Sequence, residues 1–236
     1  MHTFFLENIP EVDSEVALSR REHDHLFKTL RCRAGELLKL CDGQGTIATA
    51  EATEQRTVKV LTRATAQMDR IRVHLFVALP RNSKLDLLIK PATEAGVYSI
   101  TPLKCRYSVA EKSSIPERWY TLMEEACKQS GNPFLPQINL PQTVQEALQS
   151  CQQKNYQIFY GDQHGLPLRT EDFSSCGQLD LAWMVGPEGG FDEKELDLLS
   201  NAGRGITLGK YIFRLENAAL AGIAHLYSTA YAAAAR

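Results

Sequence analysis

Three glycines, Gly186, Gly189 and Gly190, lie within five consecutive residues, and the loop that contains them is the strongest candidate for a ligand-binding site. Glycine lets a ligand approach the backbone closely and leaves its N–H and C=O groups accessible. Acidic side chains such as Glu188 and Asp192 surround the loop, and the phosphate-binding motifs GxxxxGK(S/T) and GxGxxG are absent. The loop therefore favours a neutral or cationic ligand held by backbone hydrogen bonds. A plain turn between a strand and a capped helix is the alternative interpretation.

A second candidate loop begins at Gly209, after the next predicted strand. We expect Ile212 and Phe213 to form an apolar slot, while Arg214 and Glu216 place opposite charges beside an apolar helix. The alternative is an amphipathic core helix on which Arg214 and Glu216 form an exposed pair. Apolar residues, several of them small, recur at helical spacing and allow a close approach, as at a subunit interface. This stripe consists of Leu215, Ala219, Gly222, Leu226 and Ala230.

The basic side chains are separated from the acidic ones along the chain. Residues 20–33 and the start of the second half are rich in lysine and arginine, whereas residues 171–197 are acidic. The formal net charge is −2, so a nucleic-acid site must come from a local basic patch. Such a patch can bind phosphates, although basic clusters are more often solvated faces. The candidate RNA contacts are Lys28, Arg31, Arg33, Arg81 and Lys84.

Two patterns of hydrophobic periodicity predict two domains, residues 1–69 and residues 70–236. The first reads as short strands with a turn at residues 42–45, where Gly43 and Gly45 suit positive φ, and it predicts a small β-barrel. The second alternates strands with helices, which is typical of a parallel sheet covered on both faces. Both glycine loops follow predicted strands, and ligands bind at the carboxyl ends of such strands.

The periodicity also predicts the individual elements. Asp192 and Glu195 are placed as the N-cap and its partner, and Gly203 follows the C-terminus of the same helix. The predicted helices span residues 22–30, 83–96 with an interruption or kink near Pro91, 117–130, 143–154, 192–202 and 215–235. The predicted strands span residues 36–41, 46–52, 57–63, 72–79, 99–103, 156–160, 179–185 and 205–208.

The composition excludes several classes of protein. The chain has 236 residues, of which 44% are hydrophobic and 23% charged, as in globular domains rather than disordered chains. No apolar run approaches the roughly 20 residues of a membrane helix, and the N-terminal residues lack the pattern of a secretory signal. The six cysteines and six histidines show no metal-binding spacing. We therefore expect free, buried cysteines, no metal site and a cytosolic protein.

These features occur together in an order and spacing that resemble the RsmE family, the bacterial uridine-N3 methyltransferases of 16S ribosomal RNA within the SPOUT superfamily. The most specific motifs are residues 186–191 and residues 208–209, which lead to Arg214 and Glu216. Further matches are His25, Leu30, Arg31 and Gly35; Glu94, Gly96, Val97, Ile100 and Pro102; and residues 125–131 with Pro136.

The resemblance implies an α/β fold, with a SPOUT methyltransferase domain that carries a C-terminal trefoil knot and a small N-terminal PUA-like β-barrel that binds RNA. It also implies a homodimer that binds S-adenosylmethionine (SAM) in the knot. SAM carries a sulfonium and no phosphate, which agrees with the acidic surroundings of the first loop. The residues implied to bind SAM are Tyr160, Gly161, Val185, Gly186, Pro187, Glu188, Gly189, Gly190, Leu208, Gly209, Ile212, Phe213 and Arg214.

The implied reaction transfers a methyl group from SAM to N3 of a uridine in 16S ribosomal RNA, within the 30S subunit. Arg214 is the candidate for stabilising negative charge on the base, and Glu216 for holding Arg214 or accepting the N3 proton. One alternative is a non-catalytic RNA-binding or ribosome-assembly factor, which departures from the family pattern at Pro91, Asn132 and Tyr211 keep open. Another is a SPOUT methyltransferase that acts on tRNA or on a ribose 2′-hydroxyl.

Overall fold

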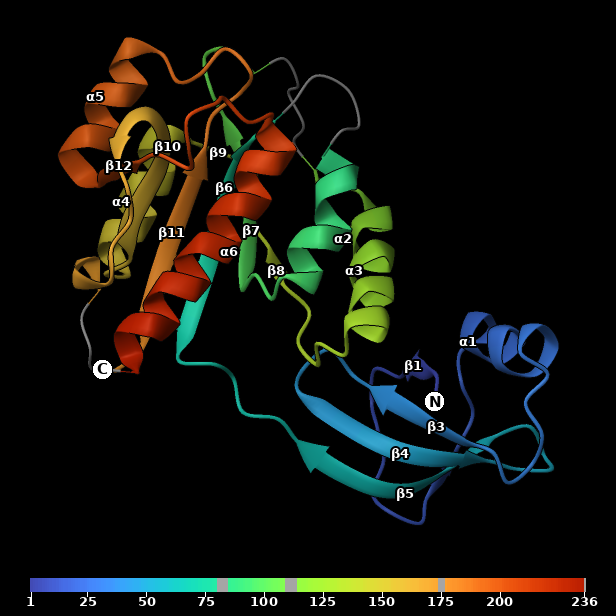
Figure 1. Cartoon of the computed structure of the whole chain (residues 1–236). Helices are drawn as coiled ribbons and strands as arrows, with labels where there is room; N and C mark the ends of the chain where they lie inside the picture. The colour runs from blue at the N-terminus through green and yellow to red at the C-terminus, as the bar shows by residue number, and fades with distance from the viewer. Residues whose placement is uncertain (80–84, 109–113, 174–176, 236) are drawn as a thin grey trace. The chain divides into compact units, whose positions relative to one another are not determined.

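The computed structural model describes residues 1–79, 85–108, 114–173 and 177–235. Within these ranges the chain forms two compact units, which are described separately (Figure 1). The first unit contains Met1–Met68 and Met123–Leu135, and the second contains Asp69–Leu122 and Pro136–Arg236. The sequence pattern gave no indication that residues after 69 return to the first unit. The helix α3 (Glu117–Ser130) contributes its C-terminal half to that return.

The first unit is built on a five-stranded sheet in the order β1-β3-β4-β5-β2. The edge strand β1 is parallel to β3, whereas the other neighbouring pairs are antiparallel. Apolar side chains from these strands, together with Ile9, Leu18 and Leu26, form a buried core. The strands are β1 (Thr3–Phe5), β2 (Glu15–Val16), β3 (Leu37–Cys41), β4 (Thr46–Ala52) and β5 (Val58–Thr65).

The turn between β3 and β4 has the predicted conformation. Gly43 and Gly45 have φ values of 74° and 103°, in the region that favours glycine. Asp42 Oδ1 accepts hydrogen bonds from the backbone N–H groups of Gln44 at 2.7 Å and Thr46 at 2.8 Å. The aspartate side chain therefore closes the turn that the glycines permit.

The returning segment 131–135 is hydrogen-bonded to this same turn. The Gly45 N–H donates to the Pro133 carbonyl at 3.0 Å, and the Leu135 N–H donates to the Gly43 carbonyl at 2.8 Å. A Cβ at Gly43 would lie 2.6 Å from the Leu135 side chain. The glycines thus also provide room for a segment that lies far away in the sequence.

The predicted helix over residues 22–30 is divided in the structure. It begins earlier, as α1 (Arg20–Asp24), and continues as a π-helical turn, η1 (His25–Thr29). Ser19 caps the start, because its Oγ accepts from the backbone N–H of Glu22 at 3.4 Å. The π-helical turn is absent from the prediction because periodicity does not distinguish it from an α-helix over so few residues.

The second unit contains a sheet in the order β12-β10-β11-β6-β7-β8, in which each neighbouring pair is parallel. Its strands are β6 (Ile71–Ala78), β7 (Ser99–Lys104), β8 (Gln137–Ile138), β10 (Gln157–Leu166), β11 (Leu179–Val185) and β12 (Arg204–Ile206), and β9 (Gln142–Thr143) also pairs with β7. The predicted α/β fold with a parallel sheet is confirmed. The strand order reverses between β6 and β11, which is where ligands bind in open sheets of this kind.

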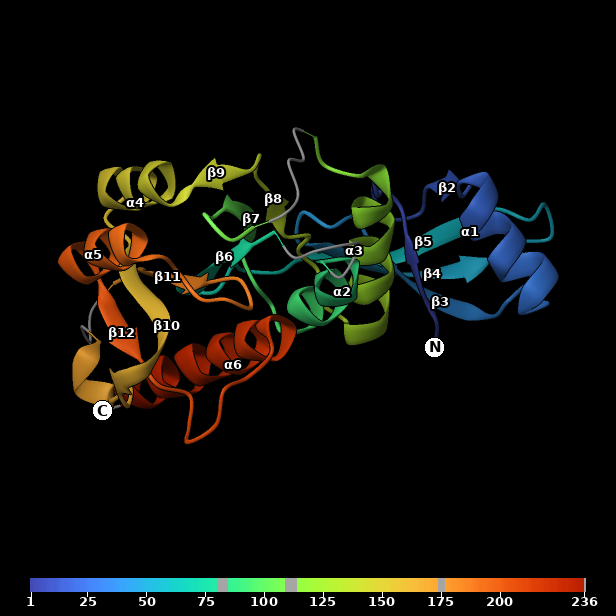
Figure 2. The same ribbon diagram turned by 90° about the horizontal axis from the view of Figure 1, so that it is seen from above.

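Helices cover both faces of this sheet (Figure 2). α6 packs on β6 and β11 and contacts α2, whereas α4 and α5 contact each other on the opposite face, where α4 also packs on β7. α2 continues through Pro91, and Asp192 and Glu195 form the predicted capping box of α5. The helices are α2 (Asp86–Glu94), α4 (Val144–Gln153), α5 (Glu193–Ala202) and α6 (Leu215–Ala234), with a short 3₁₀ turn, η3 (Thr170–Asp172).

The stripe of apolar and small residues on α6 faces the sheet of its own chain. Each of the five residues in the stripe is buried. Gly222 lies against the indole of Trp183, to which a Cβ at this position would approach within 2.0 Å. Trp183 Nε1 also donates to the Ala218 carbonyl at 3.3 Å. The small residues therefore serve packing within the chain, in place of the subunit contact that the spacing suggested.

The helices and the cysteines of the described residues complete the description of the fold. No helix among the described residues is long and apolar enough to cross a membrane. The cysteines within the described ranges are all free, and four of them are buried; they are Cys32, Cys41, Cys105, Cys127 and Cys151. Cys176 lies outside the described residues.

Candidate active site

The first glycine loop follows β11, one of the central strands of the second sheet. Val185 is the last residue of β11 and is buried, and the loop turns at once into α5. The Gly190 N–H donates to the Pro187 carbonyl at 2.8 Å, and Gly190 has a φ of 77°. A Cβ at Gly186 would lie 3.1 Å from the Phe191 ring. Glycine is therefore favoured at both ends of the loop, by the backbone conformation at Gly190 and by the close approach of the Phe191 ring at Gly186.

The acidic side chains beside this loop have structural partners. Glu195 N–H donates to Asp192 Oδ1 at 2.8 Å, and Asp192 N–H donates to Glu195 Oε2 at 2.9 Å. Glu195 Oε1 also accepts from the Arg106 N–H at 2.8 Å, which joins the end of β7 to the start of α5. The Glu188 side chain remains exposed in the loop itself. This negative charge at a helix N-terminus disfavours phosphate, as the sequence predicted.

The segment after β7 contributes residues to this edge that sequence reasoning missed. The Tyr107 side chain lies 3.7 Å from the position of a Cβ on Gly189. The sequence could have indicated this position, because Tyr107 follows a predicted parallel strand whose carboxyl end lies at the same edge as the glycine loops. Burial raises the pKa of the nearby Cys105 thiol to about 12, so this thiol stays protonated and is no nucleophile.

The second glycine loop follows β12, at the outer edge of the sheet. Gly209 has a φ of 149°, and its N–H and carbonyl both bond to Thr207 Oγ1, at 3.4 Å and 3.1 Å. Leu208 is half-buried, whereas Ile212 and Phe213 are 79% and 43% exposed. Figure 2 shows this loop extending away from the sheet before α6 begins. The single chain therefore does not gather Ile212 and Phe213 into the expected apolar slot.

Strand β10 lies between β11 and β12, the two strands that the glycine loops follow. Tyr160 pairs in register with Met184 of β11, and Gly161 pairs with Ile206 of β12. Tyr160 is buried, and this burial raises the pKa of its phenol. A Cβ at Gly161 would lie 3.5 Å from the Trp183 ring. The predicted residues of β10 thus lie beside the ends of the strands that carry both loops.

Arg214 and Glu216 lie at the start of α6. Arg214 is the N-cap residue, and its carbonyl accepts from the Ala218 N–H at 2.8 Å. Its guanidinium is exposed and makes no hydrogen bond or ion pair with the residues described, so the alternative of an Arg214–Glu216 pair is not observed. Glu216 is half-buried in the first turn, where a carboxylate is favourable. The arrangement leaves the Arg214 guanidinium available to an incoming group.

The predicted RNA contacts of the first unit lie in the π-helical turn η1 and in the segment that follows it. Lys28 Nζ lies 2.9 Å from Asp24 Oδ1, and its hydrogen bond holds the pKa of Asp24 below the ordinary value. Arg31 and Arg33 are exposed, and Arg31 has a φ of 55° where the chain leaves the turn. The other two candidates, Arg81 and Lys84, lie outside the described residues.

Comparison with known proteins identifies the class to which this fold and site belong. Residues 67–227 match the family model of an RNA methyltransferase domain. A curated relative from Rickettsia conorii, a ribosomal RNA small subunit methyltransferase E, is 31% identical over 91% of this chain and 90% of its own length. A relative of the same name from Synechocystis is 27% identical over 91% of this chain and 73% of its own.

Two solved structures of methyltransferases share the fold of this chain. A crystal structure of a ribosomal RNA small subunit methyltransferase E from Neisseria gonorrhoeae, bound to S-adenosyl methionine, is similar with a TM-score of 0.84. It shares 26% identity, and the match covers 97% of each chain. A methyltransferase from Legionella pneumophila shares the fold, with a TM-score of 0.80 at 21% identity and 96% of each chain covered. The present chain belongs to the ribosomal RNA small subunit methyltransferase E family.

Proposed function

We propose that the protein transfers a methyl group from SAM to N3 of a uridine in the 16S ribosomal RNA of the small subunit. The observation that carries this proposal is the pair of glycine loops at the carboxyl ends of β11 and β12, in a chain of this methyltransferase family. The names of the relatives favour ribosomal RNA over transfer RNA, and enzymatic activity over a non-catalytic binding role.

The residues of the two loops fit SAM. Gly186, Gly189 and Gly190 carry no side chain in the loop after β11, and Gly209 carries none after β12, so a ligand can approach the backbone at these positions. The acidic helix start beyond the first loop suits a cationic ligand better than a phosphate. When bound, SAM supplies an electrophilic methyl group on its sulfonium. The loops would hold its adenine and ribose through backbone N–H and C=O groups, with Tyr160 and Gly161 beneath them.

Arg214 and Glu216 would act on the base that receives the methyl group. Uracil N3 carries a proton and becomes nucleophilic only when that proton is lost, which leaves negative charge on the flanking carbonyl oxygens. The exposed Arg214 guanidinium is placed to stabilise this charge. Glu216, in the first turn of the same helix, would take up the N3 proton. A base that is paired in the RNA must first be opened, because N3 lies on the Watson–Crick edge.

We further propose that the second unit is a SPOUT domain whose C-terminus forms a trefoil knot. β12 lies at the outer edge of the sheet, whereas α6 packs on the central strands β6 and β11. The chain from Gly209 to Arg214 must therefore return across the sheet, as threading through a knot requires. The exposed apolar side chains of this segment, Tyr211, Ile212 and Phe213, support a homodimer in which a second copy covers them.

The first unit is proposed to be a PUA-like barrel that binds RNA. The expected division at residue 69 gives its main boundary, residues Met123–Leu135 are added to it, and the rest of the chain would be the catalytic domain. Its sheet has five strands, and the basic side chains Lys28, in the π-helical turn, and Arg31 and Arg33, in the segment after it, are exposed. They would contact phosphates and position the RNA without specifying its sequence. Arg81 and Lys84 remain candidates for the same role. With ribosomal RNA of the 30S subunit as substrate, the enzyme would act in the cytoplasm.

A methylation assay tests the proposed function. Purified 30S subunits from a strain that lacks the gene are incubated with the protein and with SAM labelled in its methyl group. The RNA is then digested and the labelled nucleoside is identified, with transfer RNA as a parallel acceptor. We expect the label in N3-methyluridine from 30S subunits. A labelled ribose methyl group, or label in transfer RNA alone, would contradict the proposal.

A further inference from the structure

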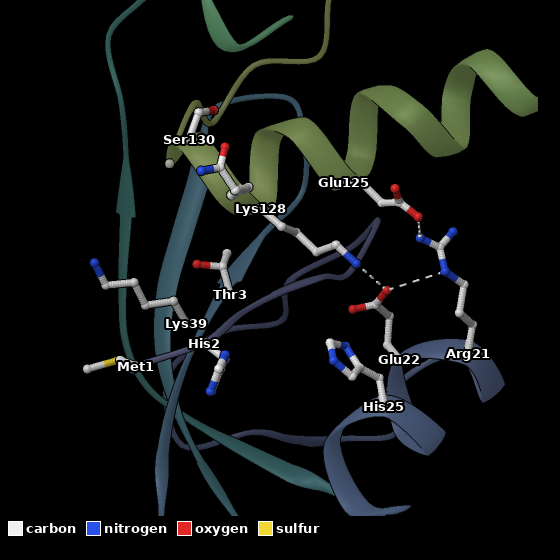
Figure 3. Close-up of a pocket in the computed structure, with 12 residues that line it drawn as sticks. Met1, His2, Thr3, Arg21, Glu22, His25, Lys39, Glu125, Lys128 and Ser130 are labelled. Atoms are coloured by element: carbon white, nitrogen blue, oxygen red, sulfur yellow. Dashed lines mark hydrogen bonds and ion pairs between the residues drawn. The ribbon is translucent and has the colours of Figure 1, made fainter. Parts of the chain in front are cut away.

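The first unit contains an open pocket of about 770 Å³ that the proposed SAM site does not use (Figure 3). Its walls come from the start of β1, the helical turn at His25, Lys39 on β3, and the last residues of α3. Each of these segments belongs to the first unit, including the part of α3 that returns to it. A pocket of this size accommodates a ligand as large as a nucleotide.

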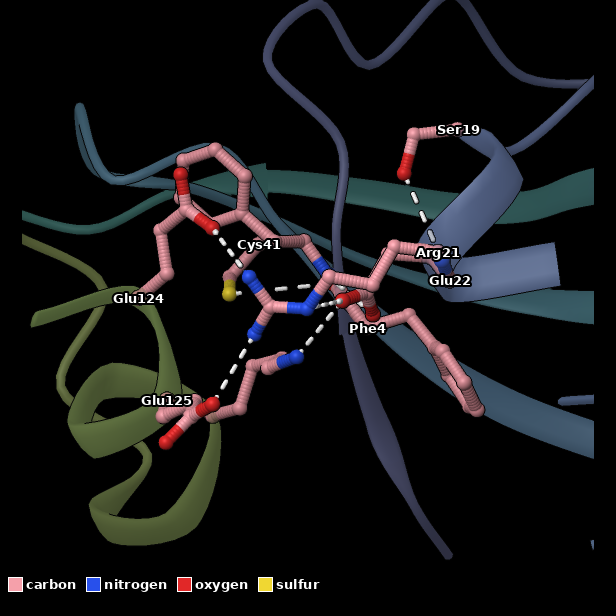
Figure 4. A network of polar contacts seen from close by, with 9 residues as sticks. Phe4, Ser19, Arg21, Glu22, Cys41, Glu124 and Glu125 are labelled. Atoms are coloured by element: carbon pink, nitrogen blue, oxygen red, sulfur yellow. Dashed lines mark hydrogen bonds and ion pairs between the residues drawn. The ribbon is translucent and has the colours of Figure 1, made fainter. Parts of the chain in front are cut away.

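A buried carboxylate holds the walls of this pocket together. Glu22 is 3% exposed, and its Oε2 accepts from the Phe5 N–H of β1 at 3.3 Å (Figure 4). Its Oε1 accepts from Lys128 Nζ of α3 at 2.6 Å. Glu22 therefore joins the edge strand to the end of the returning helix. Buried charges are retained where they are paired in this way, so we assign Glu22 and Lys128 a positioning role.

The remaining acidic groups of this region are paired with one arginine. The Arg21 guanidinium lies 3.1 Å from Glu125 Oε1 and 3.6 Å from Glu124 Oε2. By contrast, Lys39 is exposed, lines the pocket, and forms no ion pair with the residues described. With the carboxylates paired, the Lys39 ammonium is an unneutralised positive charge at the pocket. Such a charge attracts a phosphate group.

The free edge of β1 supplies hydrogen-bonding groups to the pocket. The Lys39 N–H donates to the His2 carbonyl at 2.9 Å, and the Leu6 N–H donates to the Cys41 carbonyl at 3.0 Å. Because backbone groups alternate along a strand, those of Thr3 point away from β3 and toward the pocket. One N–H and one C=O side by side match the donor and acceptor on the Watson–Crick edge of a nucleobase.

An aromatic ring lies at the same pocket. The imidazole of His25 is exposed and lines the cavity, with its ring centroid 5.7 Å from that of Phe4 beneath it. Histidine rings are among the side chains on which unpaired RNA bases stack. The pocket thus combines a positive charge, a strand edge and an aromatic face. These are the three elements that bind the phosphate, edge and face of a nucleotide.

We infer that this pocket binds one unpaired nucleotide of the RNA substrate, away from the base that is methylated. This inference rests on the proposed function in that it takes RNA as the substrate. The nucleotide's phosphate would lie at Lys39, its base edge at Thr3 and its base face at His25. The pocket would therefore fix the register of the RNA on the first unit, in addition to the phosphate contacts proposed for Lys28, Arg31 and Arg33.

Binding of a fluorescein-labelled oligouridylate, followed by anisotropy over a range of salt concentrations, tests the inference on the full chain. We expect Lys39→Ala to weaken binding about tenfold and to reduce the salt slope by about 0.7. His25→Ala should weaken it about tenfold through lost stacking, and His25→Phe should restore it. The matched control is Lys59→Ala, because Lys59 lies on a strand of the same sheet, pairs with Asp13 at 3.0 Å and does not line the pocket.

The outcomes separate this inference from the proposed function. Unchanged oligouridylate affinity in both Lys39→Ala and His25→Ala would overturn the inference that the pocket binds RNA. An equal loss of affinity in Lys59→Ala would overturn it too. If 30S subunits are methylated normally while the pocket variants bind RNA like the parent protein, the proposed function stands and the pocket fails. If no acceptor is methylated but the pocket variants lose RNA affinity and the control does not, the pocket stands and the proposed function fails.

Discussion

The Nε2 atom of His74 lies 3.0 Å from Oδ1 of Asp180, at the edge of the second sheet opposite the glycine loops. The other ring nitrogen lies 2.8 Å from Ser99 Oγ. The arrangement has the order of a Ser–His–Asp triad, but Ser99 and His74 are each only 3% exposed, so no substrate reaches the hydroxyl. The ring also stacks on Tyr156 with centroids 4.0 Å apart. This network therefore joins strands and takes no part in catalysis.

Stability should depend on pH through His74. Burial lowers the pKa of His74 below 6.5, and the positive charges of Lys154 and Arg72 act in the same direction, against the hydrogen bond that His74 donates to Asp180 and the negative charge of Asp180. The unfolded chain thus binds the proton more tightly, and the stabilisation is complete above pH 6.5 and is lost as pH falls below it. Urea unfolding should show a loss approaching about 1.4 kcal/mol per pH unit.

His74→Gln is the variant that tests this dependence, since its side chain is polar but does not titrate near neutral pH. Its free energy of unfolding should fall less steeply than that of the parent protein between pH 6.5 and pH 5. Identical slopes in the two proteins would show that His74 is not the group responsible.

Because Gly222 contacts Trp183, replacing this helical glycine with alanine should destabilise the protein, although the same replacement usually stabilises a helix. Glycine to alanine in an exposed helix position stabilises a protein by about 1 kcal/mol. At Gly222 the added methyl group would meet the indole at 2.0 Å, so we expect Gly222→Ala to destabilise the protein by about 1–3 kcal/mol. Ala224→Gly, at an exposed position of the same helix, should cost only about 1 kcal/mol. A Gly222→Ala protein more stable than its parent in urea would contradict this packing.

Gly190→Ala should weaken SAM binding. The residue has a φ of 77°, where a side chain costs about 1–2 kcal/mol, and relief of that strain would move the loop. Calorimetry should therefore show affinity for SAM reduced about tenfold or more. Gly96→Ala is the matched control, because Gly96 has a φ of 78° at the end of α2, before β7 begins. Equal SAM affinities in the two variants would argue against the glycine loop as the cofactor site.

Arg214→Ala should reduce kcat by about 10²–10³-fold, the loss typical of removing a group that stabilises transition-state charge. The affinity for SAM should change little, because the proposed role concerns the base. Lys210→Ala serves as the control, since Lys210 is an exposed cation of the same loop. If the Arg214→Ala enzyme has normal kcat at saturating substrate but binds SAM weakly, Arg214 binds the cofactor and does not act on the base.

Local patterns allowed the sequence to predict several features correctly. The capping box of Asp192 and Glu195 and the positive φ values of Gly43 and Gly45 depend only on near neighbours, and the structure confirms them. Strand and helix alternation likewise predicted the parallel sheet. Such features follow from backbone preferences that a few residues determine.

Features that depend on distant residues were not predictable in the same way. Nothing in the sequence around Phe134 indicates that it pairs with Gln44, ninety positions earlier in the chain. The position of Tyr107 beside Gly189, and the pocket joined by Glu22 and Lys128, likewise arise only when separate segments pack together. The stripe on α6 shows the converse, because its spacing indicated a close approach but not the partner, which is Trp183.

Mass spectrometry of nucleosides from the 16S ribosomal RNA of a strain in which the gene is deleted tests the proposed reaction in the cell. We expect N3-methyluridine to be lost, the intact gene to restore it, and a gene encoding Arg214→Ala to restore little of it. N3-methyluridine at the parental level in the deletion strain would show that this protein does not form it.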